Sequence, residues 1–371
     1  MKKEKVLYIG GFEMPDKNAA AHRVVAVAKC MQYLNYEVSF IGITHSDAFN
    51  GSFEGFGYKA LRYPRSRKEW VRYAIGADIL EMVKQQPVDI IIAYNYPAVA
   101  LARITFYARK RGVKVVGDIT EWYESKYWYR QLDTFLSMRC VYKHLDGIIA
   151  ISKYLYDYFS PCKRMLLPPI VDKEEDKWKK KAMPDHLFVE AADKIKIVYA
   201  GNPGKKDLLG RVVRALEKID GTRLMLTIIG MDKEQFANTY GAEGCDKVNI
   251  SFMGKKTHQE VISILSSSDF QIIIRESNRL CNAGFPTKFV ETIMAGASVI
   301  ANHFSDIADY LEDGVNGFLL DSSEIEEIAK TLNKVSQLSR KEIDEMKSNI
   351  QKISFDYRRF LPQVKDFLSI I

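Results

Sequence analysis

Short apolar runs alternate with helical stretches along the first half of the chain. The apolar runs have the length of strands and occupy residues 5–11, 36–43, 88–95, 113–119 and 145–152. After the first of them, residues 19–34 place Val24, Ala28 and Met31 at helical spacing. Strands that lack polar alternation are buried on both faces, as in a parallel sheet covered by helices. The pattern predicts a doubly wound α/β domain.

The same alternation begins again at residue 195, after a charged stretch at 171–186 that carries no apolar period. We interpret this stretch as the interdomain connection, either as a solvated linker or as a patch at a membrane surface. The second half predicts a further set of strands, starting at 195 and then at 224–230, 248–254, 270–275, 297–302 and 317–321. Helices are expected at 208–219, 258–269 and 289–296, with a polar helical tract at 324–352. Two doubly wound domains are therefore expected, and ligands of such sheets bind beyond the carboxyl ends of the strands.

Composition narrows the class of protein. The chain has 371 residues, of which 47% are hydrophobic and 27% charged, as in ordinary globular proteins of two domains. No apolar run reaches the length of a membrane span, and the short N-terminal run does not resemble a signal peptide. Five scattered cysteines and six unclustered histidines predict neither a metal site nor disulfides, and hence a cytoplasmic protein.

The net charge of +7 favours an anionic partner. Nucleotide phosphates, a lipid diphosphate and an anionic membrane face all satisfy this condition. Nucleic acid is not expected, because the chain has no basic tail and no recognition motif.

The loop "GNPGKKD" at 201–207 follows a predicted strand and precedes a predicted helix. Gly201 allows the backbone to approach a ligand, and helix N–H groups directed at the loop favour a phosphate there. The sequence matches neither GxxxxGK[ST] nor GxGxxG, so an ordinary turn with exposed lysines remains the alternative. The residues expected to bind are Gly201 and Lys205 or Lys206. Gly11 lies in the matching loop of the first half.

The stretch "NAGFPTKFVETIMAGASVI" at 282–300 places charges at the start of a largely apolar helix. Charged side chains on a buried helix cost free energy unless they are paired or bind a ligand. Glu291 is suited to accept hydrogen bonds from two ribose hydroxyls, although a surface pair with Lys288 at i, i+3 is the simpler alternative. The other residues expected at this anion or sugar site are Gly284, Phe285, Pro286 and Thr287.

This stretch resembles the donor-site helix of retaining nucleotide-sugar glycosyltransferases of the GT-B fold, the group 1 or family 4-like transferases. Their pattern has two glutamates separated by seven residues, and Glu291 matches the second, which the resemblance makes the ribose-binding residue. The first falls on Ala283. "IVYAGNPGKKDLLGRVVRAL" resembles the strand, loop and helix that bind the donor diphosphate, with Lys206 at the lysine and Asn202 at the arginine position.

Other segments share the resemblance. Residues 248–275 are similar to the segment that contacts the base, around Gly254 and Lys255, and Arg275 is a candidate for the donor-sugar contact. "FDYRRFLPQVKDFL" at 355–368 looks like the final helix that crosses back to the first domain. The resemblance implies two Rossmann-like domains facing a cleft: residues 1–170 with the crossover helix 355–371 on the acceptor side, and 171–354 on the nucleotide-sugar side.

In the first domain, "VVGDITEWYESKYW" turns polar where a strand ends, and Thr120 falls at the family's histidine position. We expect Glu121 to contact the donor sugar or the acceptor. Asp118 is a second catalytic candidate, with capping of the next helix as the alternative. The aromatic residues at 122–129 suit a sugar face, a membrane interface or the interior of the domain.

The resemblance implies transfer of a sugar from a nucleotide-diphosphate sugar to an acceptor hydroxyl with retention. We expect a UDP- or GDP-sugar as substrate, no separate cofactor or metal, and Lys206 as the group that stabilises the leaving diphosphate. We expect a sugar, polysaccharide or lipid-linked acceptor in bacterial polysaccharide or glycoconjugate biosynthesis. Peripheral association with the inner membrane face is compatible with this expectation. A nucleotide-sugar epimerase and a non-catalytic nucleotide-binding protein are the alternatives.

Overall fold

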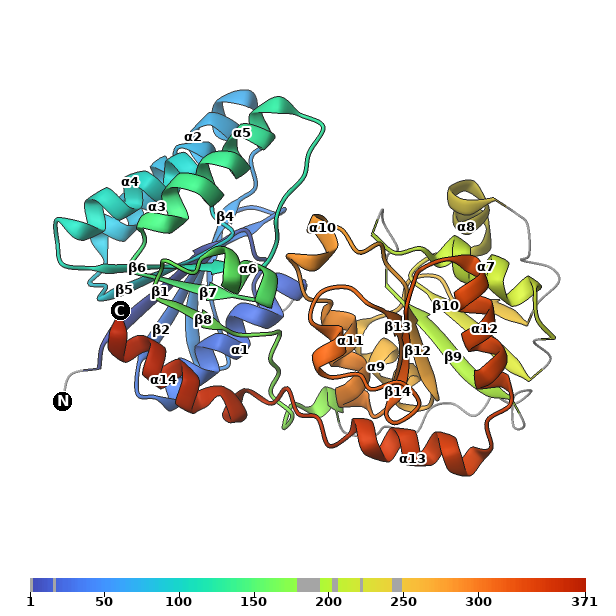
Figure 1. Ribbon diagram of the computed structural model, residues 1–371. Helices are drawn as coiled ribbons and strands as arrows, with labels where there is room; N and C mark the ends of the chain where they lie inside the picture. The colour runs from blue at the N-terminus through green and yellow to red at the C-terminus, as the bar shows by residue number, and fades with distance from the viewer. Residues whose placement is uncertain (1–2, 16–17, 179–193, 202–205, 221–222, 242–248) are drawn as a thin grey trace. The chain divides into compact units, whose positions relative to one another are not determined.

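The computed structural model describes residues 3–15, 18–178, 194–201, 206–220, 223–241 and 249–371 (Figure 1). The chain forms two compact units. The first comprises Met1–Asp172, Ala283–Phe285 and Asp356–Ile371, and the second comprises Lys173–Asn282 and Pro286–Phe355. The chain therefore leaves the second unit twice, at 283–285 and again after Phe355.

The first unit is built on a sheet of eight strands in its described part, in the order β3-β4-β2-β1-β5-β6-β7-β8. All neighbours are parallel except β3 and β4. The strands are β1 (Lys5–Gly10), β2 (Glu37–Thr44), β3 (Phe49–Phe53), β4 (Phe56–Arg62), β5 (Ile90–Tyr94), β6 (Lys114–Ile119), β7 (Gly147–Ala150) and β8 (Arg164–Leu166).

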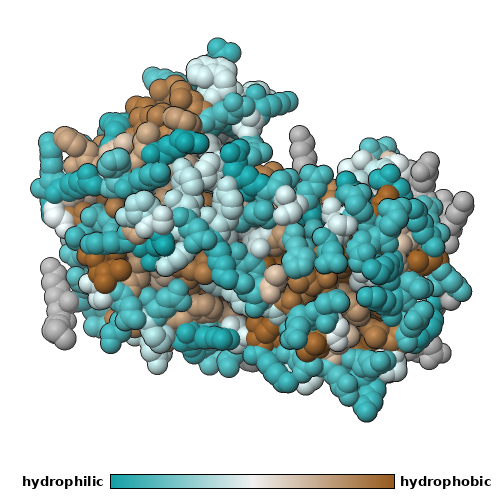
Figure 2. All heavy atoms as spheres, in the orientation of Figure 1, coloured by the Kyte–Doolittle hydropathy of each residue, from teal (hydrophilic) through white to brown (hydrophobic). Residues whose placement is uncertain are grey.

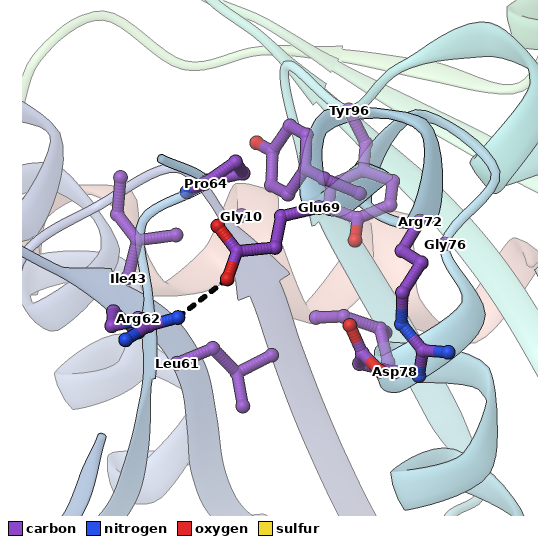
Figure 3. Close-up of a pocket in the computed structure, with 12 residues that line it drawn as sticks. Gly10, Ile43, Leu61, Arg62, Pro64, Glu69, Arg72, Gly76, Asp78 and Tyr96 are labelled. Carbon is purple, nitrogen blue, oxygen red and sulfur yellow. Dashed lines mark hydrogen bonds and ion pairs between the residues drawn. The ribbon is translucent and has the colours of Figure 1, made fainter. Parts of the chain in front are cut away.

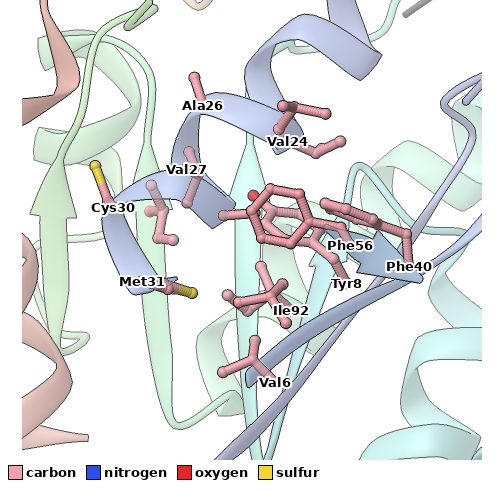
Figure 4. Close-up of a cluster of buried hydrophobic side chains, with 14 of the residues drawn as sticks. Val6, Tyr8, Val24, Ala26, Val27, Cys30, Met31, Phe40, Phe56 and Ile92 are labelled. Atoms are coloured by element: carbon pink, nitrogen blue, oxygen red, sulfur yellow. The ribbon is translucent and has the colours of Figure 1, made fainter. Parts of the chain in front are cut away.

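Helices cover both faces of this sheet. Figure 1 shows α2 to α5 on one side of the sheet and α1 and α14 on the other. Their bounds are α1 (Ala19–Tyr33), α2 (Arg67–Ala74), α3 (Ala77–Gln85), α4 (Ala98–Arg109), α5 (Trp128–Leu136), α6 (Lys153–Tyr158) and α14 (Leu361–Ile370). The core under α1 includes Tyr8, Phe40, Phe56 and Ile92 (Figure 4), and Phe367 of α14 belongs to the same cluster.

The second unit has a parallel sheet of six strands among its described residues, in the order β11-β10-β9-β12-β13-β14. These are β9 (Ile195–Ala200), β10 (Leu224–Ile229), β11 (Ile250–Phe252), β12 (Phe270–Ile273), β13 (Ser298–Asn302) and β14 (Gly317–Leu320). The helices are α7 (Leu209–Glu217), α8 (Lys233–Tyr240), α9 (His258–Ser266), α10 (Arg279–Asn282), α11 (Thr287–Ala295), α12 (Ile325–Ser336) and α13 (Arg340–Ile350). Two doubly wound α/β units confirm the predicted fold class.

The polar tract predicted at 324–352 is two helices, α12 and α13. The helical tract is interrupted at Ser339, which is the N-cap of α13. Its side chain accepts a hydrogen bond from the Glu342 amide, while the Glu342 carboxylate accepts one from the Ser339 amide. This reciprocal capping starts a new helix within a sequence that is helical on both sides.

Candidate functional site

Asp118 lies at the end of β6 in a fully buried ion pair of the first unit. Its Oδ1 is 2.7 Å from the Arg23 Nη2, and its Oδ2 accepts a hydrogen bond from the Tyr8 hydroxyl. Arg23 also donates to the carbonyl oxygens of Leu167 and Pro168. Burial and the Asp118 charge raise the pKa of Tyr8 well above its ordinary value, so Tyr8 stays a donor. The carboxylate thus joins β1, β6 and α1 in the interior of the unit, and the predicted catalytic role of Asp118 stays a prediction.

The loop after β6 is fixed by the loop after β5. The Asn95 side chain accepts from the Thr120 amide at 3.0 Å and donates to the Thr120 hydroxyl at 2.6 Å. Thr120, at the position where the resembled family has a histidine, is thereby buried and bonded to its neighbours. Glu121 follows it, half-buried, beside Asn95 and Tyr123 around a small cavity. Its predicted contact with substrate stays a prediction.

A larger pocket of about 280 Å³ opens in the first unit where β1, β2 and β4 end. Figure 3 shows Gly10, Ile43 and Leu61 on the sheet side, with residues of the α2–α3 region opposite them. Two ion pairs, Arg62 with Glu69 and Arg72 with Asp78, lie along it. Gly11, predicted at this strand end, directly follows Gly10 and is exposed.

Tyr96 lines the same pocket and is only 2% exposed. Among the residues that the structure describes, its hydroxyl has no hydrogen-bond partner. A buried hydroxyl without a partner costs about 1–3 kcal/mol. The Tyr96 hydroxyl is itself closed off from solvent, so this polar group lies beneath the wall of the pocket.

In the second unit, the loop after β9 begins at Gly201, whose φ of +124° suits glycine. A Cβ at this position would lie 2.6 Å from the Lys288 Cε, so the backbone here runs directly against the lysine side chain. The loop returns to the sheet at Asp207, which is 4% exposed. Asp207 forms an isolated β-bridge with Arg275, which lies two residues after the end of β12.

Asp207 gathers three donors around one buried carboxylate. Its Oδ1 is 2.5 Å from the Arg275 Nε, and its Oδ2 is 2.5 Å from the Lys288 Nζ and 2.6 Å from the Tyr199 hydroxyl. Burial alone would raise the pKa of Asp207, but the charges of Arg275 and Lys288 hold it below its ordinary value. Two cations and one carboxylate leave a net positive charge at the carboxyl ends of β9 and β12.

Glu291 lies one turn after Lys288 on α11 and faces the start of α9. Its Oε1 is 3.0 Å from the His258 Nε2, and its side chain is 21% exposed. The predicted alternative of a Lys288–Glu291 surface pair is wrong, because each side chain takes a distant partner instead. The second carboxylate oxygen of Glu291 and its partial exposure suit it to accept a hydrogen bond from a ligand hydroxyl.

An open hollow of about 540 Å³ lies at the carboxyl ends of β9 and β10. It is lined by Gly201, Ile229, Gly230, Met231, Gln235, Thr239, Lys255, Lys256 and Val261. Gly254, with a φ of +61°, accepts a hydrogen bond from the Gly230 amide through its carbonyl oxygen. Two predicted residues, Gly201 and Lys255, thus share one hollow, and Gly254 positions its rim.

The remaining predicted residues are placed as follows. Lys206 is half-buried immediately before Asp207, whereas Asn202 and Lys205 lie outside the described residues. Pro286 is the N-cap of α11 and not its first helical residue, so the first turn begins at Thr287. Gly284 and Phe285 group with the first unit, where the Ser152 hydroxyl donates to the Ala283 carbonyl oxygen at 2.8 Å.

Sequence reasoning did not select Asp207, Tyr199 or His258. A signal for Asp207 exists, since it is the one carboxylate among the cations of "GKKD". His258 directly follows Thr257, which forms a capping box with Glu260. That pattern places His258 at a helix start, but it does not reveal Glu291 as its partner.

Known proteins resemble this chain in sequence and in fold. The family described as "Glycosyl transferases group 1" matches residues 185–353. An uncharacterized glycosyltransferase of Methanocaldococcus jannaschii is 23% identical over 243 residues, which cover 61% of this chain and 59% of that protein. The chain thus spans about three fifths of the length of this curated relative.

Two similar solved structures extend over nearly the whole chain. Anabaena HepE in complex with UDP and glucose is 16% identical, with a TM-score of 0.72, and the match covers 99% of this chain and 100% of that one. Sucrose-phosphate synthase from Thermosynechococcus elongatus is 12% identical, with a TM-score of 0.73 and coverage of 99% and 98%. At these identities the likeness shows the fold. The chain therefore has the GT-B fold, and its segment 185–353 matches the family described as "Glycosyl transferases group 1".

Proposed function

We propose that this protein transfers a sugar from a nucleotide-diphosphate sugar to an acceptor hydroxyl, with retention of configuration, in the synthesis of a bacterial polysaccharide or glycoconjugate. The observation that carries the proposal is the net positive cluster of Asp207, Arg275 and Lys288 behind the backbone of Gly201. This cluster lies at a loop between β9 and the start of α7, where helix N–H groups add to the attraction for a diphosphate. HepE, with the same fold, is found in complex with UDP.

The donor is held through its nucleotide in this proposal. Glu291 accepts hydrogen bonds from the two ribose hydroxyls, and the base occupies the hollow beside Gly254 and Lys255. His258 orients the Glu291 carboxylate from the opposite helix at 3.0 Å. A carboxylate that accepts hydrogen bonds from two vicinal hydroxyls distinguishes a ribose from a deoxyribose, because the deoxyribose offers only one of these hydroxyls.

Transfer breaks the bond between the anomeric carbon and the diphosphate oxygen. The diphosphate leaves with the bonding electrons, the acceptor oxygen bonds to the anomeric carbon, and the proton of the acceptor hydroxyl passes to an oxygen of the departing diphosphate. The positive cluster and Lys206 lower the barrier by stabilising the charge that grows on the leaving diphosphate. Because Lys288 is already held by Asp207 and Tyr199, it acts as fixed charge rather than as a group that must reorganise.

The pocket at the ends of β1, β2 and β4 is our candidate for the acceptor. Replacing Tyr96 with phenylalanine removes a hydroxyl that has no partner among the described residues. We expect unfolding stability to be unchanged or raised by up to about 1 kcal/mol, since no native hydrogen bond is lost. Donor affinity stays as in the wild type, and the rate of transfer falls about five- to tenfold. Chemical denaturation and a transfer assay measure the two effects, and an unchanged transfer rate would remove Tyr96 from the acceptor site.

Product analysis tests the reaction itself. The full-length protein is screened by thermal shift against UDP-, GDP- and ADP-sugars, since a ligand of the folded state raises its melting temperature. The sugar that binds is then incubated with candidate acceptors, and NMR reports the anomeric configuration of the product. A retained glycosidic product supports the proposal. An epimerised nucleotide sugar, or binding with neither transfer nor hydrolysis, would assign the protein to one of the two alternatives.

A further inference from the structure

The helix α5 is exposed along nearly its whole length, and none of its residues is buried. Trp128 is 73% exposed, Tyr129 51%, Leu132 47% and Phe135 52%. Trp128, Leu132 and Phe135 follow each other at helical spacing, so they form an apolar stripe on the outside of the helix. Soluble monomers rarely expose contiguous apolar groups of this size without a partner.

The neighbouring helix α4 continues this character. It packs against α5 and exposes Phe106, at 65%, and Val99, at 47%. Figure 2 shows hydrophobic atoms on the surface of the first unit where its upper helices end. We call the exposed side chains of Val99, Phe106, Tyr127, Trp128, Tyr129, Leu132 and Phe135 the aromatic surface.

Basic side chains surround the aromatic surface. Residues 98–111 and 126–143 contain eight of them, all exposed: Arg103, Arg109, Lys110, Arg111, Lys126, Arg130, Arg139 and Lys143. The same two segments contain one acidic residue, Asp133. Its carboxylate is occupied in accepting a hydrogen bond from the Ala98 amide at the start of α4. The charge of this surface is therefore strongly positive.

The cations lie against the rings rather than apart from them. The Lys110 Nζ is 4.2 Å from the centre of the Phe106 ring, and the Arg139 guanidinium is 5.3 Å from that of Phe135. Lys126 and Arg130 are both placed over Tyr127. Aromatic and cationic groups thus lie in one layer, as they do at the headgroup level of a membrane.

We infer that the aromatic surface and its basic side chains dock the first unit onto an anionic lipid bilayer. Anionic lipids attract each nearby Lys or Arg by about 1 kcal/mol, and Trp, Phe and Leu enter the headgroup region beneath them. A protein partner fits less well, because protein interfaces are depleted of lysine, whereas here Lys110 and Lys126 lie over the exposed rings. In the described residues no helix has the length and apolar character of a membrane span, so the contact is peripheral. The inference does not depend on the proposed transfer reaction.

Vesicle sedimentation tests this inference with the full-length protein. We expect the protein to sediment with phosphatidylcholine vesicles that contain about one quarter phosphatidylglycerol, to remain in solution with pure phosphatidylcholine, and to be released by added salt. Replacing Trp128 and Phe135 together with serine weakens the partition about tenfold or more. The control variant replaces Tyr33 and Val315, which are also exposed, with serine. We expect this control to leave the partition unchanged.

Charge reversal is the second arm. Arg130→Glu with Arg139→Glu lowers the partition about tenfold or more, whereas Lys330→Glu with Lys341→Glu on the second unit leaves it near the wild-type value. Lys330 and Lys341 are 63% and 86% exposed, so the control matches the variant in charge. The inference is overturned if anionic vesicles do not sediment the protein, or if variants and controls partition alike. It is also overturned if the serine variant abolishes a dimer in sedimentation velocity while vesicles bind nothing, because the surface is then a contact between copies.

Discussion

Replacing Asp207 with asparagine is expected to destabilise the second unit by about 3–5 kcal/mol. The carboxylate is the shared counter-charge of Arg275 and Lys288, whose side chains are only 13% and 16% exposed. Without it, two neighbouring cations remain buried against each other. Urea unfolding, with hydrogen exchange of the β9 and β12 amides to follow the second unit by itself, measures the loss.

The matched control for this change is Glu345→Gln. Glu345 also pairs with a lysine in the second unit, but the pair is 3.9 Å long and largely exposed, so the expected cost is at most about 0.5 kcal/mol. A double variant, Asp207→Asn with Lys288→Met, removes one stranded charge and should recover part of the stability. A loss below about 1 kcal/mol in the single variant would show that Asp207 does not hold the cluster together.

Replacing Glu291 with glutamine is expected to weaken the affinity for the nucleotide about 10- to 100-fold. The change keeps the size of the side chain but removes the charge that strengthens hydrogen bonds from the ribose hydroxyls. Because the ribose belongs to the nucleotide and not to the transferred sugar, affinity for the nucleoside diphosphate and for the nucleotide sugar should fall by the same factor. Isothermal titration calorimetry with both ligands measures the two factors.

Two comparisons sharpen this result. Glu312→Gln, at an exposed carboxylate of the second unit, should leave both affinities unchanged. In the wild type, the 2′-deoxy nucleotide should bind more weakly than the ribonucleotide, and in Glu291→Gln this preference should shrink. If only the nucleotide sugar loses affinity, Glu291 contacts the donor sugar instead, and the assignment of the ribose to it is contradicted.

Most strands of the two sheets could be predicted from the sequence because they are apolar on both faces. The hairpin of β3 and β4 and the short strand β8 were not predicted. The hairpin lies at the edge of the sheet, so its polar and apolar positions are mixed. At Gly51 of β3, the Tyr58 ring of β4 occupies the space that a Cβ atom would need. An edge strand that is shaped by one aromatic neighbour leaves little periodicity for a sequence pattern to show.

The candidate site was only partly predictable for a different reason. Glu291, Lys288 and Gly201 were identified from local sequence, since a helix start or a strand end marks each of them. The charged residues pair with partners that are distant in the sequence. Lys288 is separated from Asp207 by 81 positions, and Asp118 is separated from Arg23 by 95 positions. Local spacing cannot reveal such pairs, so the partner of Asp118 could not be predicted and Lys288 was weighed as a partner of Glu291. Only the folded structure shows that the carboxylates of Asp118 and Asp207 are held by buried partners, whereas Glu291 stays partly exposed.

A crystal structure of the full-length protein with a bound nucleoside diphosphate tests the central claim most directly. The account predicts the diphosphate at the Gly201 loop and the start of α7, and both ribose hydroxyls within hydrogen-bonding distance of the Glu291 carboxylate. A nucleotide bound away from these residues, or a ribose with no contact to Glu291, would contradict it.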